Sequence, residues 1–104
     1  MNELSPRQKL HLKLVELRDN NYIYFQPPAN IRMCYPAIVY NLSDIVNNPA
    51  DNVKYKSMKR YTIISITTDP DDNIVDKINA LPYCSYDRHY VQDNLYHDVF
   101  SIYI

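Results

Sequence analysis

The chain contains no glycine in its 104 residues, whereas average usage of about 7% would supply roughly seven. Glycine allows the backbone to turn sharply through left-handed conformations or to approach a ligand closely. Phosphate-binding loops, dinucleotide-binding fingerprints and the nucleophile elbow of hydrolases all depend on it. The composition therefore excludes these three kinds of site.

The chain also lacks long apolar runs and a large net charge, and it has only two cysteines. No apolar run approaches the roughly 18 residues needed to cross a bilayer, so we expect no membrane contact. The net charge is -1 and the pI is about 6.2, so no global field attracts nucleic acid. Met1 to Lys9 is polar and lacks the apolar stretch of a secretory signal. We therefore expect synthesis in the cytoplasm, where Cys34 and Cys84 remain buried thiols in preference to one disulfide.

Tyrosine is abundant where glycine is missing, with eleven residues in one chain. Tyrosine offers a large, fairly rigid contact area with a polar tip, and it is enriched where protein surfaces meet. A chain of this length forms one domain with a modest core. We therefore expect an assembly or interaction protein that is not an enzyme and that uses no cofactor or metal.

A first helix is predicted at about residues 5–19. Ser5 is a good N-cap, Pro6 suits the first helical position, and Gln8 completes a capping box. Leucines recur at helical spacing behind this cap, which indicates one buried stripe. The Asp19-Asn20-Asn21 run ends the helix, and asparagine suits a left-handed cap where glycine is absent.

A second helix is predicted at about 70–81, with Asp69 as its cap and Pro70 in its first turn. Runs rich in β-branched and aromatic residues predict strands at about 22–26, 36–41, 59–68, 83–91 and 96–103. The stretch at about 42–58 is predicted to be a long hairpin or loop arm. This order predicts an α+β fold, with a single mixed, mostly antiparallel sheet flanked by two helices.

The most suggestive polar cluster lies in the predicted C-terminal hairpin: Asp87, Arg88, His89, His97 and Asp98. A turn at Gln92–Leu95 would place His89 opposite Asp98 and the two histidines on opposite faces. A slip of one residue would instead bring the histidines together. The cluster is therefore either a metal or general-base site or a set of cross-strand polar pairs; the absence of a recognised ligand spacing favours the pairs.

A second cluster is basic and contains Lys54, Lys56, Lys59 and Arg60, interleaved with Tyr55 and Tyr61. Basic residues with aromatics can bind nucleic acid. A solvated arm explains so small a patch at least as well, and contact with an acidic partner surface is a third interpretation.

Three stretches of the chain have a distinctive sequence: Tyr35-Pro-Ala-Ile-Val-Tyr40, Lys59-Arg-Tyr-Thr-Ile-Ile64 with the following Asp69-Pro-Asp71, and Leu81–Tyr90 continued by Asp93–Phe100 to the end. In these stretches the chain resembles the small tail terminator and head–tail joining proteins of tailed bacteriophages. Together they cover roughly residues 20–104. The N-terminal helix is similar only in kind.

The resemblance implies a non-enzymatic structural protein of the virion neck, made in the host bacterial cytoplasm, whose copies form a ring that is typically a hexamer. Its implied partners are other copies of itself, the tail tube protein and the head–tail connector or stopper protein. The expected contact residues are Lys54, Tyr55, Lys56, Lys59, Arg60, Tyr86, Arg88 and Tyr90. The alternatives are another connector protein, such as a stopper or adaptor, and a small nucleic-acid-binding or regulatory module that uses the Lys54–Tyr61 patch.

Overall fold

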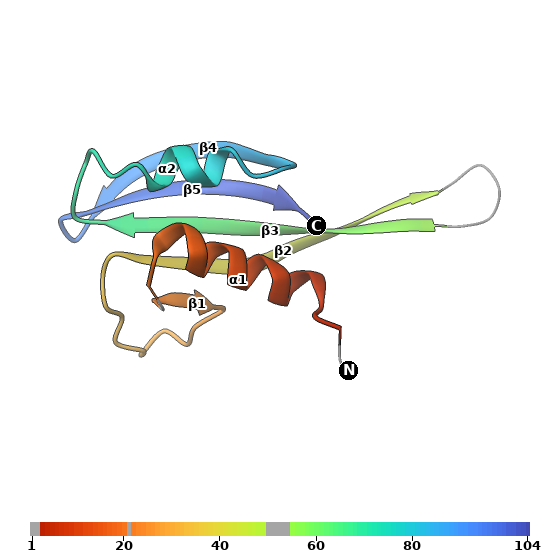
Figure 1. The fold of residues 1–104 in the computed structure, drawn as a ribbon, viewed down its shortest axis with the longest axis horizontal. Coiled ribbons are helices and arrows are strands. Elements are labelled where there is room, and N and C mark those ends of the chain that lie inside the picture. Colours follow the sequence, from red (N-terminus) through yellow and green to blue (C-terminus); the bar gives the residue numbers. More distant parts are fainter. Residues whose placement is uncertain (1–2, 21, 50–54) are drawn as a thin grey trace.

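One five-stranded sheet carries both helices on the same face (Figure 1). The computed structural model describes residues 3–20, 22–49 and 55–104. Its elements are α1 (Pro6–Arg18), β1 (Ile23–Phe25), β2 (Ala37–Pro49), β3 (Tyr55–Thr67), α2 (Ile74–Asn79), β4 (Cys84–Gln92) and β5 (Leu95–Tyr103). The strand order is β1-β2-β3-β5-β4, with β1 parallel to β2 and the other pairs antiparallel. The predicted α+β fold with a mixed, mostly antiparallel sheet is confirmed.

Helix α1 begins and ends on local signals. The Oγ of Ser5 accepts from the backbone N–H of Gln8 at 3.2 Å, and the Gln8 side chain accepts from the Ser5 N–H at 2.8 Å. These two bonds form the predicted capping box. The left-handed residue at the other end is Asp19, with φ 62°, in place of the expected asparagine. Its short polar side chain tolerates this conformation for the same reason.

Helix α2 is shorter than the prediction of about 70–81. Asp69 does not cap it, because its Oδ1 accepts from the N–H of Asp71 and folds the chain into a local turn. Asp72 Oδ1 accepts in the same way from the N–H of Ile74, at 3.0 Å. These side-chain turns compete with helix and delay its start to Ile74.

Strands β2 and β3 continue far into the segment that was predicted to be an arm. Their pairing runs from Ala37↔Ile66 to Pro49↔Tyr55, with one bulge between Leu42 and Asp44. Strand β5 pairs with β3 only from Arg60 onward, and β1 pairs with β2 only up to Tyr40. The segments 44–49 and 55–59 therefore form a two-stranded ribbon that projects from the sheet (Figure 1). The predicted strand ends at 41 and 59 were wrong, and the arm is a hairpin.

The core lies between the helices and the sheet. Its fully buried members include Leu14 from α1, Ile78 from α2, and Tyr40, Ile63 and Phe100 from the sheet. Burial of an aliphatic or aromatic side chain contributes about 1.5–3 kcal/mol each, so this layer holds the helices in place.

The two cysteines are free thiols. Cys84 is half-buried, and burial raises the pKa of its thiol to about 11. Cys34 is exposed, so the prediction that it is buried was wrong. It lies in the connector before β2, where its backbone N–H donates to the Tyr24 hydroxyl at 3.2 Å.

Candidate interaction surfaces

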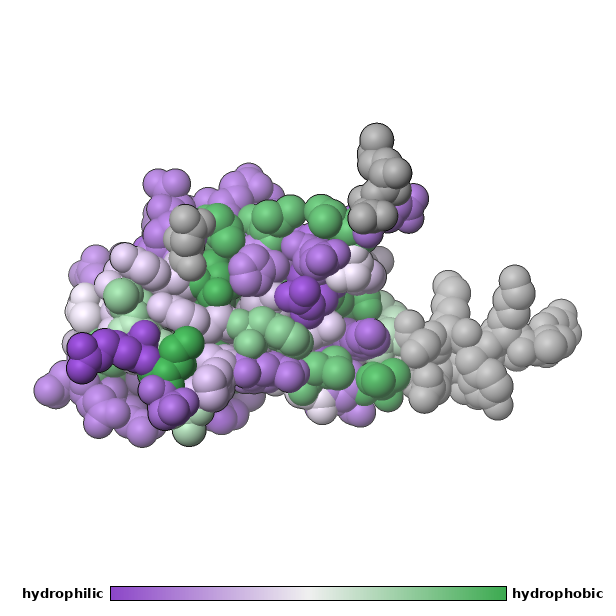
Figure 2. All heavy atoms as spheres, turned by 90° about the horizontal axis from the view of Figure 1, so that it is seen from below, coloured by the Kyte–Doolittle hydropathy of each residue, from purple (hydrophilic) through white to green (hydrophobic). Residues whose placement is uncertain are grey.

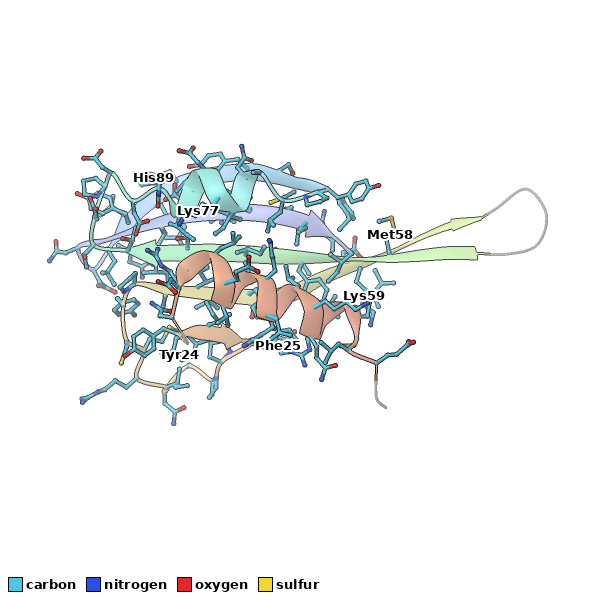
Figure 3. All side chains as sticks on the ribbon, in the orientation of Figure 1. Tyr24, Phe25, Met58, Lys59, Lys77 and His89 are labelled. Carbon is cyan, nitrogen blue, oxygen red and sulfur yellow. The ribbon has the colours of Figure 1, made fainter. Side chains whose placement is uncertain are left out.

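The predicted contact residues of the arm lie on or beyond strand β3. Lys54 lies outside the described residues, while the backbones of Tyr55 and Lys56 pair with Pro49 and Asn48. Lys59 stands at the root of the ribbon (Figure 3), and Arg60 follows it on β3. Neighbours on a strand point to opposite faces, so these two cations do not form one patch.

Lys59 is exposed on the side of the sheet that carries the helices. It borders a groove of about 410 Å³ together with Arg7, Phe25, Leu42 and Ile104. Its backbone exchanges two hydrogen bonds with Ile104, of 3.2 and 3.0 Å. This exchange fixes the place where the ribbon leaves the sheet.

Arg60 belongs to the other face, where it is held by β2. Its guanidinium lies 3.9 Å from the Asp44 carboxylate, and its Nε donates to the Ser43 hydroxyl at 3.3 Å. That hydroxyl in turn donates to the Arg60 carbonyl at 2.9 Å. Ser43 is the bulged residue, so the bulge and this cation stabilise each other.

Tyr61 is not available to a partner. It is only 3% exposed, and its ring packs near those of Phe25 and Tyr40, with centroids 6.3 and 6.2 Å away. A base cannot stack on a ring inside the core. Tyr61 therefore cannot take part in the basic and aromatic patch that was considered for nucleic-acid binding.

Tyr86, Arg88 and Tyr90 lie on the edge strand β4, but they do not share one face. A bulge between Tyr86 and Arg88 places Tyr86 opposite Phe100, on the helix side, while Arg88 faces Val99 and Tyr90 faces His97. The Tyr90 ring stacks on His97 at 4.6 Å, and the Arg88 guanidinium lies 5.9 Å from the Tyr90 ring. Arg88 also pairs with Asp87 at 2.9 Å.

The same bulge brings His89 to the helix side. Of the two registers that the sequence left open, the structure has the one in which His89 pairs with Asp98 and Tyr90 with His97, so the two histidines lie on opposite faces. Nδ1 of His89 donates to Asp98 Oδ1 at 2.8 Å, and the Tyr86 hydroxyl donates to the same oxygen at 2.9 Å. Burial, followed by the bond to Asp98, raises the pKa of Tyr86.

An acidic hollow of about 370 Å³ adjoins this cluster, lined by Asp69, Asp71, Asp76, His89 and Asp98 among others. Asp72 at its side is paired with Arg18 at 2.9 Å. Within residues 3–20, 22–49 and 55–104, no group of three or more His, Cys, Asp or Glu side chains is arranged to hold a metal ion. The contacts that the structure shows within the cluster are the cross-strand bonds of His89 and Tyr86 to Asp98.

A hydrogen-bond chain that the sequence did not indicate ties α1 to β2. The guanidinium of Arg7 donates to the Tyr40 hydroxyl at 3.0 Å, and this hydroxyl donates to Nδ1 of His11 at 2.7 Å. Burial, followed by the positive charge of Arg7, lowers the pKa of His11. The lowered pKa favours the neutral form of His11, whose Nδ1 accepts from the Tyr40 hydroxyl in the tautomer that carries its proton on Nε2.

A second missed feature is an apolar groove of about 340 Å³ between α1, the α2–β4 connection and the end of β5. Leu10, Leu81, Pro82, Ile102 and Ile104 lie along it. These positions come from three distant parts of the chain, so no local pattern in the sequence indicates the groove.

No protein-family model matches the chain, and no curated protein matches it. Among the described residues, no helix is long and apolar enough to span a membrane.

Proposed function

We propose that the chain is a structural protein of the neck of a tailed phage, a tail terminator whose copies form a ring. In this role it caps the tail tube and joins it to the head connector. Three resembling stretches support the proposal: Tyr35–Tyr40, Lys59–Ile64 with Asp69–Asp71, and Leu81 to the end. The composition supports it too, since an assembly protein needs contact area and no glycine-dependent site.

The observation that carries the proposal is the projecting ribbon of residues 44–49 and 55–59. Within the described chain, these two segments pair with each other, and only Lys59 at their root also bonds through its backbone to another strand end, at Ile104. A two-stranded ribbon alone is marginally stable in water. Leu42 and Ile45 at its root are 38% and 46% exposed, and hydrophobic side chains gather where the ribbon leaves the body (Figure 2). Contact with another copy would cover these side chains and stabilise the ribbon.

Strand β4 offers a second contact surface, at the outer edge of the sheet. An edge strand presents unpaired backbone groups that can recruit another chain. The bulge at Asp87 interrupts that edge, so we expect contacts through the side chains of Tyr86, Arg88 and Tyr90. A ring requires two different surfaces on each copy, and the ribbon and the β4 edge supply two.

The remaining partners follow from the same role. The tail tube protein would meet one face of the ring and the head–tail connector or stopper protein the other. The protein would act without catalysis, in the virion, after synthesis in the host bacterial cytoplasm.

The experiment is to shorten the ribbon without disturbing the body. Val46 and Met58 pair directly, so residues 47–57 can be replaced by Asn-Gly, a two-residue turn suited to joining paired positions. The shortened chain should keep its circular dichroism spectrum but lose assembly, as measured by light scattering. The matched control places Asn-Gly at Asp93-Asn94, another turn, and should assemble normally. A shortened chain that assembles as well as the control would contradict the proposal.

A further inference from the structure

The apolar groove beside α1 has a positively charged rim. Lys9 and Lys13 border it from α1, while Leu81, Ile102 and Ile104 supply apolar wall. Lys9 has no ion-pair partner among the described residues, and Lys13 makes only an exposed contact with Glu16, at 3.6 Å. Exposed pairs of this kind are weak and easily exchanged. The groove therefore suits a segment that carries both an apolar and an acidic side chain.

Tyr83 marks this groove as a contact surface. It borders the groove, yet its side chain is 77% exposed. Its backbone is left-handed, with φ 60°, a conformation that is strained for a residue with a bulky side chain. The N–H of Tyr103 donates to the Tyr83 carbonyl at 3.2 Å and holds it there. A strained residue that displays a large aromatic ring is a feature of interaction sites.

The opposite end of the molecule has complementary chemistry. Thr67 pairs with Tyr96 and Val91 with Tyr96, so the β3–α2 and β4–β5 connections meet at the end far from Tyr83 and Ile104 (Figure 1). The β4–β5 turn presents Asp93 beside Val91, which is 59% exposed. Asp69 and Asp71 lie on the neighbouring connection and are exposed. The exposed Val91, at the end of β4 and beside these acidic residues, fits an apolar groove with lysines on its rim.

We infer that the groove binds the β4–β5 turn of a second copy, with Val91 against the groove wall and Asp93, Asp69 and Asp71 facing Lys9 and Lys13. This inference deepens the proposed ring and rests on it. The contact joins unlike ends of two copies. Such heterologous contacts propagate from copy to copy and close when the rotation permits. Charge complementarity sets the direction, because two like ends would bring like charges together.

Disulfide trapping tests the contact directly. One preparation carries Lys9→Cys and a second, with a size tag, carries Asp93→Cys; both carry Cys34→Ser to remove the exposed native thiol. Oxidation of the mixture should give about ten times more disulfide-linked dimer than oxidation of either variant alone. The reason is that the two ends that carry the cysteines meet head to tail. Arg32→Cys, another exposed cation, replaces Lys9→Cys in the control mixture. Mixed dimers at the control level, in preparations that do form rings, would overturn the inference and leave the proposed function standing.

Charge reversal supplies an independent readout. Lys9→Glu with Lys13→Glu should weaken self-association about tenfold or more, and Asp69→Lys with Asp71→Lys in the partner copy should restore it. Arg32→Glu with Lys77→Glu makes the same change of charge on exposed positions away from the groove and should have no effect. Loss of association without rescue would overturn the inference. A wild-type chain that never associates would overturn the proposed function, and the inference with it.

Discussion

His89 and Asp98 face each other across the β4–β5 ladder, with Nδ1 of the histidine 2.8 Å from the carboxylate. Asp98 is only 7% exposed and also accepts the Tyr86 hydroxyl. The turn of Asp93 and Asn94 fixes this register, because both residues are left-handed, with φ 55° and 62°. A local turn thus decides which polar groups meet some distance away.

Removing the Asp98 carboxylate should destabilise the hairpin. Asp98→Ala leaves the Tyr86 and His89 donors without their common acceptor, and we expect a loss of about 1–3 kcal/mol in the free energy of unfolding. Urea denaturation measures it. Asp87→Ala, which removes an exposed carboxylate from the same hairpin, should change stability by less than about 0.5 kcal/mol. Equal effects for the two variants would contradict a structural role for Asp98.

The Arg18–Asp72 pair should be worth more than a surface ion pair. The two side chains lie 2.9 Å apart and are 14% and 11% exposed. Burial alone would raise the pKa of Asp72, but the adjacent Arg18 guanidinium and hydrogen bonds from the Ile74 N–H and the Thr67 hydroxyl lower it below its usual value. Arg18→Ala should cost about 2–3 kcal/mol and raise the pKa of Asp72 in an NMR titration. Lys13→Ala, which breaks the exposed pair with Glu16, should cost less than about 0.5 kcal/mol; a similar cost for both would count against the account.

Acid should weaken the contact of α1 with β2 through His11. Its pKa is lowered from 6.5 by burial and by Arg7, so the folded state takes up a proton less readily than the unfolded state. The contribution of neutral His11 to the free energy of unfolding is complete above pH 6.5 and is lost as the pH falls below that value. His11→Asn keeps an acceptor for the Tyr40 hydroxyl and cannot titrate. Its free energy of unfolding should therefore fall less than that of the wild type between about pH 7 and pH 5. If the free energies of unfolding of the two proteins fall in parallel with pH, His11 is not the source of the acid sensitivity.

Tyr83 should lower the stability of the isolated chain and strengthen its self-association. Tyr83→Asn relieves the left-handed strain and removes a ring that is 77% exposed. The isolated chain should gain about 0.5–1 kcal/mol in thermal or urea unfolding, while self-association weakens. Tyr22 is 40% exposed and lies away from the groove. Tyr22→Asn is therefore the control and should not weaken assembly. A Tyr83→Asn chain that is less stable than the wild type would contradict this expectation, because it would show that the Tyr83 aromatic side chain packs against its own chain.

Short-range signals in the sequence predicted much of the fold. The capping box of Ser5 and Gln8 and the pairing of His89 with Asp98 both depend on residues close in the chain. The missing glycines also have a visible consequence, because among the residues that the structure describes, non-glycine residues occupy the left-handed positions: Asp19, Gln26, Tyr83, Asp93 and Asn94. Three of these five are Asp or Asn, which tolerate that conformation best.

The errors arose where intrinsic residue preferences do not decide the structure. Asn47, Asn48 and Pro49 are poor strand formers, but pairing with residues 55–57 makes them a strand. The bulge at Asp87 separates Tyr86 from Arg88 and Tyr90, and nothing in the local sequence marks it. The groove beside α1 unites three segments from the two ends of the chain, so only the folded structure reveals it.

The most direct test of ring formation is the mass of the wild-type protein in solution. Light scattering across a concentration series, with negative-stain images of the same peak, distinguishes a ring from a single chain. We expect a closed ring of about six subunits, in which the copies meet through unlike surfaces. A mass of 12.4 kDa at every concentration, up to the solubility limit, would contradict it.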